Sequence, residues 1–260
     1  MFGVGVGVRV GGQRFGGDAG FDSDYQAVLN YATTQGYTLP SAGQQVKQNQ
    51  LVLDLKSGGI WSKLDTFAVF ATDGNIDFAL IDWKRLSQYT AVNSPTFTTN
   101  EGFTGNGTSS YVDTNFNPST SGVNYTLNNA SRYFFPHAFV STGRIDGTTS
   151  TAVNSIVRSS LATQRINSGS GNLALSFDYT AVINPKSIHR TSLTSVDLFN
   201  GTAGTTGVQT SASILNSNQF VLRSATSYGA HTASAYAMGA SLVSENTAFV
   251  NAYDTYKAAI

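Results

Sequence analysis

Acidic side chains are the residues most able to cleave a sugar chain, because retaining hydrolysis needs two carboxyl groups roughly 5 Å apart. The sequence has two glutamates, Glu101 in a turn-rich stretch and Glu245 in a predicted C-terminal helix. Asp77 and Asp82 are closer in sequence, but their odd spacing in a predicted strand puts them on opposite sides. No pair of facing carboxyl groups is predicted, so we expect the protein not to be an enzyme.

Histidine and cysteine give no pattern of a metal site or a nucleophile. His137, His189 and His231 are far apart, and none has a second histidine or a carboxylate at metal-ligand spacing. We expect each to lie at a turn or a strand edge with ordinary hydrogen bonds. The absence of cysteine removes disulfides, thiol catalysis and cysteine-ligated metals. The sequence therefore predicts no catalytic residue, no metal and no cofactor.

Three aromatic residues are candidates for a different chemistry, in which a ring stacks on the apolar face of a sugar. They are Trp83, which precedes two cations, and the tyrosines Tyr111 and Tyr228. For Trp83 the alternative is partial burial at the end of a strand, where a tryptophan more often packs than binds. These three residues form the candidate glycan-stacking set.

The composition limits the partners of the protein. Charged residues make up 12% of the chain, about half the usual share. Lys and Arg together number 15 and balance 15 Asp and Glu, so no broad field attracts nucleic acid or anionic lipid. No run has the length of a membrane span, and the first residues lack the pattern of a secretory signal. We therefore expect neither nucleic acid nor a membrane as a partner.

Glycine dominates the first residues of the chain. Met1–Gly17 alternates Gly with Val or Arg, and so many glycines disfavour a central strand. Residues 1–20 are predicted to form an extended attachment arm that becomes ordered on a partner or on sister subunits. The alternative is a flexible tail.

Two helices are predicted in residues 21–65, which we expect to form a small helical hairpin. The first is Phe21–Gln35, which has apolar residues at helical spacing and ends before Gly36. Ser41 is placed to cap the second helix, which runs to about Lys56. Its apolar face is expected to comprise Ala42, Val46 and Leu53, extended near the end by Leu51, Val52 and Leu55.

Alternating residues and frequent turn signals predict antiparallel β-structure over residues 66–260. Ser110–Asn115, for example, places Tyr111 and Asp113 on one side of a strand and Val112 on the other. A hairpin turn is expected at residues 72–75, and a helix at Ser244–Ala259. The other predicted strands are Thr66–Ala71, Ile76–Trp83, Thr96–Thr99, Arg132–Phe135, Ala152–Val157, Leu161–Ile166, Leu173–Tyr179, Lys186–Leu193, Val196–Asn200 and Asn218–Arg223. Short strands at this spacing are typical of a β-sandwich.

The same region carries a family resemblance. The segments GFTGNGTSSYVDTNFNPSTSGVNYTLNNAS, FALIDWK and LRSATSYGAHTASAYAMGASL resemble concanavalin A-like (laminin-G-like) jelly-roll modules in virion structural proteins of tailed bacteriophages, particularly those infecting Bacteroidetes. The resemblance covers roughly residues 73–260. It implies a mainly β fold, a concanavalin A-like jelly-roll β-sandwich with a small N-terminal helical region and a C-terminal helix.

The resemblance also makes calcium the metal to consider, because laminin-G-like modules sometimes bind it through Asp, Asn and backbone oxygens. Asp113, Asn115 and Asn117 alternate as such ligands would. Alternating polar residues on the solvent face of a strand explain them equally well, so no metal is predicted.

Three functions follow from these observations. The first is a non-enzymatic phage virion structural protein, namely a fibre, baseplate-associated or capsid-decorating component that is assembled in the host cytoplasm. Its partners would be other virion proteins and sister subunits. The second is a carbohydrate-binding module that recognises host surface glycans. The third, a glycan-cleaving depolymerase, lacks the carboxyl pair described above.

Overall fold

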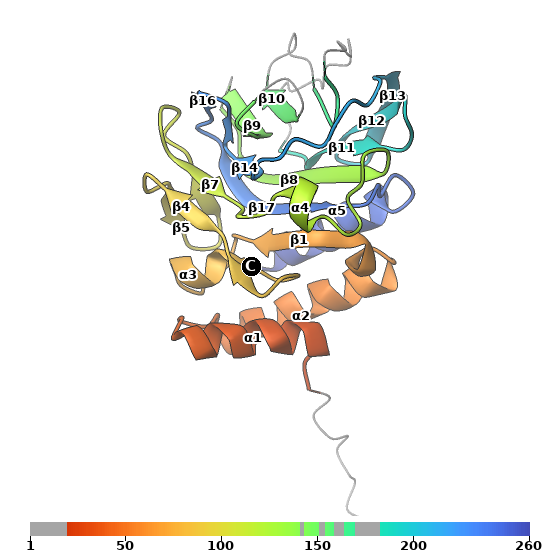
Figure 1. Ribbon diagram of the computed structural model, residues 1–260. Coiled ribbons are helices and arrows are strands. Elements are labelled where there is room, and N and C mark those ends of the chain that lie inside the picture. Colours follow the sequence, from red (N-terminus) through yellow and green to blue (C-terminus); the bar gives the residue numbers. More distant parts are fainter. Residues whose placement is uncertain (1–19, 141–142, 151–153, 159–163, 170–182) are drawn as a thin grey trace, which may run out of the picture.

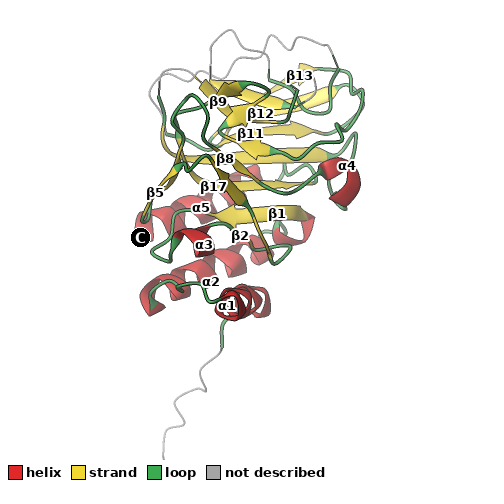
Figure 2. Cartoon of the chain, turned by 60° about the vertical axis from the view of Figure 1, so that its left-hand side comes forward, coloured by secondary structure: helices red, strands yellow, loops and turns green. Residues whose placement is uncertain are grey.

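A computed structural model describes residues 20–140, 143–150, 154–158, 164–169 and 183–260 of the chain. The arm expected at residues 1–20, apart from Gly20, lies outside the described residues, as does all of the expected strand Leu173–Tyr179. The first residues of the expected strands Ala152–Val157 and Leu161–Ile166 also lie outside them. The described residues form two main sheets, two further two-stranded sheets and a group of helices (Figure 1, Figure 2).

The N-terminal helices form where the sequence predicts them. Helix α1 spans Ser23–Gln35; the Asp22 side chain caps its first turn, and Gly36 ends it in the left-handed conformation with a φ of 76°. Helix α2 spans Ala42–Ser57, and the Ser41 hydroxyl accepts a hydrogen bond from the Gln44 N–H at 3.3 Å. A short 3-10 helix at Trp61–Lys63 then leads into the first strand. These local signals were sufficient because each lies within one turn of the helix end that it fixes.

The buried face of α2 differs from the predicted one. Val46 and Leu53 are 59% and 40% exposed, whereas Gln44 and Gln48 are buried together with Leu51 and other apolar residues of the same face. The side-chain amides of the buried glutamines form hydrogen bonds within the protein. The Gln48 side chain accepts from Tyr25 Oη at 2.7 Å and donates to Tyr256 Oη at 3.1 Å. A hydrogen-bonded amide can be buried at little cost, so the polar residues turn inward.

The larger sheet has eight strands, all paired antiparallel. Its order is β13-β12-β11-β8-β17-β6-β5, and β1 also pairs with β17. The bounds are β1 Leu64–Val69, β5 Thr96–Thr98, β6 Gly102–Thr104, β8 Ala130–Ala138, β11 Lys186–Arg190, β12 Ser195–Asn200, β13 Ala203–Val208 and β17 Thr232–Gly239. The strand pairing shifts register where β17 passes Pro136, because proline has no N–H to donate to the neighbouring strand.

The smaller sheet has five strands in the order β10-β9-β14-β7-β4. The bounds are β4 Thr90–Val92, β7 Tyr111–Asp113, β9 Gly143–Gly147, β10 Ser155–Arg158 and β14 Phe220–Val221. Two short hairpins accompany the sheets, β2 Ile81–Asp82 with β3 Ser87–Gln88 and β15 Arg223–Ser224 with β16 Ser227–Tyr228. One-turn helices occur at α3 Ile76–Ala79 and α4 Pro118–Ser121.

Two hydrophobic clusters hold these layers together. One lies between the sheets and includes Phe134 and Tyr236, whereas the other lies between the larger sheet and the helices and includes Tyr133 and Phe135. Successive residues of β8 thus point to opposite faces, and both faces of this central strand are buried. The predicted fold class, a jelly-roll β-sandwich with N-terminal helices and a C-terminal helix, is confirmed.

The C-terminal helix α5, Asn246–Ala259, forms as predicted and packs on the larger sheet. Its buried residues Phe249 and Tyr253 contact Phe135, whose ring lies 5.1 Å and 4.2 Å from theirs. The helix therefore packs on the outer face of the larger sheet, not on an end of the sandwich, and Figure 2 shows it behind β17.

The strand predicted at Ile76–Trp83 is wrong. Its first half is helix α3, because the Asn75 side chain accepts from the Phe78 N–H at 3.0 Å and so caps a helical turn. Only Ile81–Asp82 is a strand, and it pairs with β3. The expected hairpin at residues 72–75 does not form, because β1 pairs with β17 instead.

Candidate functional site

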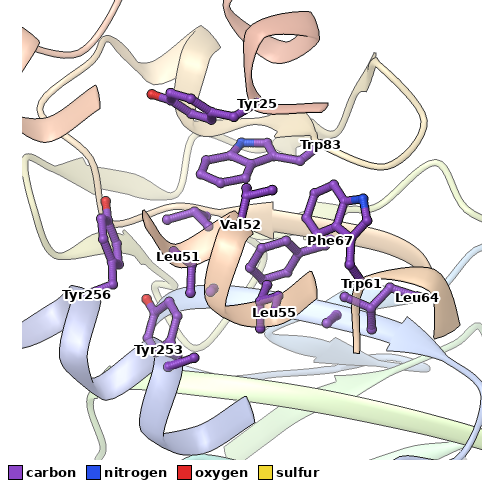
Figure 3. Packing of buried hydrophobic residues seen from close by; sticks show 14 of the residues in the cluster. Tyr25, Leu51, Val52, Leu55, Trp61, Leu64, Phe67, Trp83, Tyr253 and Tyr256 are labelled. Carbon is purple, nitrogen blue, oxygen red and sulfur yellow. The ribbon is translucent and has the colours of Figure 1, made fainter. Parts of the chain in front are cut away.

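Trp83 does not lie where it could bind a sugar. Its side chain is 2% exposed, and its ring lies 5.6 Å from that of Tyr25 and 5.7 Å from that of Phe67. Figure 3 shows it enclosed by these two residues in the cluster beneath the helices. The prediction of Trp83 as a stacking residue is therefore corrected: helix α1 covers it, and its role is core packing.

Tyr111 and Tyr228, in contrast, are brought together, with ring centroids 6.1 Å apart. Tyr111 lies on β7, which pairs with β14 through Val112 and Val221. The chain then continues from β14 into the β15–β16 hairpin, which carries Tyr228. Val112 and Val221 are fully buried between the sheets, so by alternation Tyr111 lies on the outer face of the smaller sheet.

Arg223 lies in the middle of this group. Its guanidinium carbon is 4.5 Å from the ring centre of Tyr111, 4.6 Å from that of Phe220 and 5.7 Å from that of Tyr228. Its Nε donates to the backbone oxygen of Ala225 at 2.9 Å. A cation over aromatic faces is attracted by their negative quadrupoles, so the arginine and rings hold one another in place. We call Tyr111, Phe220, Arg223 and Tyr228 the aromatic–arginine cluster.

The cluster is accessible to a ligand. Tyr111, Arg223 and Tyr228 are partly exposed, whereas Phe220 is 5% exposed and forms the base of the cluster. The sequence analysis missed Phe220 and Arg223. A signal for them was present in FVLRSATSY, in which an arginine follows an apolar run and a tyrosine follows the next turn.

Asp113 is the carboxylate beside the cluster. Its Oδ1 accepts from the Asn115 N–H at 2.8 Å and from Asn218 Nδ2 at 3.1 Å. Burial raises the pKa of this carboxyl, while these hydrogen bonds and the charge of Arg223 act to lower it. Asp113 is therefore held by neutral donors of the protein.

The residues considered as calcium ligands are engaged elsewhere. Asn115 Nδ2 donates to the Gln88 backbone oxygen at 2.9 Å, and Asn117 Oδ1 accepts from the Ser119 N–H at 3.0 Å. In the described part of the chain, no group of three or more His, Cys, Asp or Glu side chains is placed to hold a metal ion. These side chains stabilise local turns.

The two glutamates lie at opposite ends of α5. Glu245 immediately precedes the helix and pairs with Lys63 at 2.8 Å. Glu101 follows Asn100, whose backbone oxygen accepts from Lys257 in the last turn of the helix. The length of α5 thus separates them.

The histidines differ from expectation in one respect. His189 and His231 are fully buried, and His189 lies in β11, an interior strand of the larger sheet, not at a turn or an edge. His231 Nδ1 accepts from the Val140 N–H at 3.2 Å. His137 is partly exposed, with its Nε2 3.8 Å from Glu101. His189 can be buried in an interior strand because the polar atoms of its side chain have hydrogen-bond partners inside the fold.

The searches for related proteins show no family for the chain. No family model matches the chain, and no curated protein matches it. Among solved structures, it is similar to domain 4 of AbnA, a GH43 extracellular arabinanase from Geobacillus stearothermophilus, in complex with arabinotriose. The identity is 11%, the TM-score 0.43, and the match covers 72% of this chain and 98% of the domain.

None of the described helices is long and apolar enough to cross a membrane.

A second likeness is to the sialidase of Trypanosoma rangeli in complex with sialic acid, with 10% identity and a TM-score of 0.44. The match covers 80% of this chain but 39% of the sialidase. Likenesses this distant carry no argument about function, which must come from the chain's own residues.

Proposed function

We propose that the protein is a non-enzymatic carbohydrate-binding β-sandwich module and that the aromatic–arginine cluster is its binding surface. The observation that carries the proposal is the convergence of Tyr111 and Tyr228 around Arg223 on the outer face of the smaller sheet. Aromatic faces present flat apolar area to the C–H groups of a sugar ring, and their hydroxyl groups can bond its hydroxyls.

The setting that we propose is a phage virion, in which the chain is a structural protein of a fibre, baseplate or capsid surface. The quoted resemblance supports it, and so does the charged fraction of 12%, which leaves an uncharged polar surface. In this setting, the segment before α1 attaches the module to other virion proteins or sister subunits. The two proposals are compatible, because a virion protein can also recognise host glycans.

Replacing Tyr228 with Ala should weaken glycan binding about five- to tenfold, because one stacking face is lost. Isothermal titration of the full chain with purified host surface polysaccharide measures the change. Tyr31→Ala is the matched control: Tyr31 also lies beside a second tyrosine, Tyr37 at 6.4 Å, but on the helical side, and no arginine of the described residues lies over its ring. Equal affinity of both variants and the unchanged protein would place the binding surface elsewhere. New sugar-chain ends in the mixture would overturn the non-enzymatic assignment.

The virion proposal predicts self-association through the first residues. We expect the full chain to be an oligomer by light scattering and a chain beginning at Phe21 to be a monomer. The glycan affinity per chain should be the same in both. A full chain that is already monomeric would argue against an assembly role for this segment.

A further inference from the structure

Arg223 and Arg85 both lie over an aromatic ring, but only Arg85 has its charge neutralised. Arg85 lies 5.2 Å from the ring centre of Phe116 and pairs through Nε with Asp82 at 2.8 Å. Its terminal nitrogens donate to the Asn115 backbone oxygen at 3.1 Å and 3.2 Å. All the side-chain nitrogens of Arg85 thus have partners within the protein.

Arg223 keeps its terminal nitrogens available. Within the described part of the chain it forms no ion pair, and its one hydrogen bond is from Nε to the Ala225 backbone oxygen. Asp113, the acid that influences it, is already bound by Asn218 and Asn115. The outward part of the guanidinium therefore offers N–H donors and a full positive charge at a partly exposed position.

We infer that this surface recognises an acidic sugar, in which a ring carboxylate binds the terminal nitrogens of Arg223 and the ring contacts Tyr111 and Tyr228. The guanidinium has the planar geometry for two parallel N–H···O bonds to a carboxylate. The three rings lie within 5.7 Å of its carbon and restrict its movement. The ligand class is a polysaccharide that contains uronic acids or other carboxylate-bearing sugars. This inference rests on the proposed glycan binding and adds the charge of the ligand.

The test uses the full chain on an array of oligogalacturonate, oligoguluronate, hyaluronan oligosaccharides and sialyllactose, each beside its methyl-esterified form, with neutral galactan and mannan oligosaccharides. Methyl esterification removes the charge and keeps the ring. We expect binding to a carboxylated sugar that falls at least about tenfold in its ester, as is usual for loss of a hydrogen bond to a charged group.

Arg223→Gln should give a loss of similar size, and Arg223→Lys, which keeps the charge but not the planar pair of donors, a smaller loss. Lys47→Gln makes the same charge change on α2, away from the cluster, and should bind as the unchanged protein does. The thermal unfolding midpoints of the variants report whether Arg223 also supports the hairpin. Because Arg223→Lys retains a cation over the rings, its affinity tests the inference even if Arg223→Gln unfolds.

The outcomes separate the inference from the function on which it rests. If neutral or esterified sugars bind equally well, and Tyr228→Ala weakens them while Arg223→Gln does not, the acidic ligand is wrong and the glycan-binding function stands. If neither the array nor host polysaccharide binds, the proposed function fails and the inference fails with it.

Discussion

Asp146→Asn should lower the free energy of unfolding by about 3–5 kcal/mol, because it leaves a buried guanidinium without its counter-charge. Asp146 and Arg132 are both fully buried between the sheets, with Nη1 and Oδ1 2.8 Å apart. The same carboxylate accepts from Tyr236 Oη at 2.8 Å and from the Ile156 N–H at 2.8 Å. An amide at this position cannot accept on both sides and has no charge to offer Arg132.

Urea unfolding at pH 7 measures the effect, and Glu245→Gln provides a matched control with the same carboxylate-to-amide change. The Glu245 and Lys63 side chains are 19% and 40% exposed, so this pair is solvated and its loss should cost less than about 1 kcal/mol. Equal costs for the two variants would show that the buried pair is not a dominant electrostatic contact. Replacing both buried partners with apolar residues should cost less than Asp146→Asn, because no charge is then stranded.

The sequence determined the parts of the fold that depend on local signals. Helix α1 has its cap, its apolar spacing and its terminal glycine within one stretch, and Gly36 adopts the expected left-handed conformation. The alternation at Ser110–Asn115 correctly put Tyr111 and Val112 on opposite sides of the strand, and the structure shows that Val112 is the buried one. In both cases the deciding neighbours are adjacent in sequence, so no knowledge of the tertiary structure was needed.

The failures have a common cause, which is that the deciding partner is distant in sequence. Val46 and Leu53 of α2 were expected inside, but Gln44 and Gln48 take the buried positions because Thr72 and Tyr256 supply hydrogen-bond partners for them. Ile76–Trp83 is an apolar run whose period fits a strand or a helix equally, and the Asn75 cap decided the matter.

The candidate site shows the same division. Local alternation was enough to find Tyr111. The residues that surround it, however, depend on the pairing of β7 with β14, and no local sequence pattern predicts this pairing. Arg223 was missed because its proposed role depends on contacts with three aromatic rings. One of these, Tyr111, comes from a distant part of the chain. Trp83 was mistaken for the same reason, since Tyr25 of α1 covers it.

The burial pattern distinguishes the outer face of the smaller sheet, which carries the proposed binding surface. The central strands β1, β8 and β17 are buried on both faces, one against the smaller sheet and the other against the helices. The outer face of the smaller sheet has no such helical layer among the described residues, and its side chains at Tyr111 and Asp113 remain partly exposed. The proposed binding surface therefore lies on a sheet face that none of the described helices covers.

The other large effect concerns acid, because His189 is held neutral inside the larger sheet. The Leu242 N–H donates to its Nδ1 at 3.2 Å, so this nitrogen is the acceptor. The other nitrogen, Nε2, therefore carries the hydrogen and donates to Ser187 Oγ at 2.9 Å. Ser187 Oγ in turn donates to Asn246 Oδ1, which also accepts from Tyr133 Oη at 3.0 Å. A second proton on His189 would face the Leu242 N–H and find no acceptor.

Burial lowers the pKa of His189 from its ordinary 6.5 to about 3. Above pH 6.5 the imidazole is neutral in both the folded and the unfolded protein, so its contribution to stability is complete. As the pH falls below 6.5, His189 becomes protonated in the unfolded chain, whereas in the folded protein it stays neutral until about pH 3. The free energy of unfolding should therefore fall by about 1.4 kcal/mol per pH unit over this window from His189 alone, about 4–5 kcal/mol in total.

His189→Gln removes this titration, so the difference in unfolding free energy between pH 7 and pH 4 should shrink by about 3 kcal/mol, even if the variant is less stable at pH 7. The contributions of the carboxylates are the same in both proteins and cancel in the comparison. A His189→Gln protein that loses as much stability between pH 7 and pH 4 as the unchanged protein would mean that the folded state accepts the proton. The second proton would then lie on Nδ1, and the Leu242 N–H would have to give up its hydrogen bond to that nitrogen at low pH.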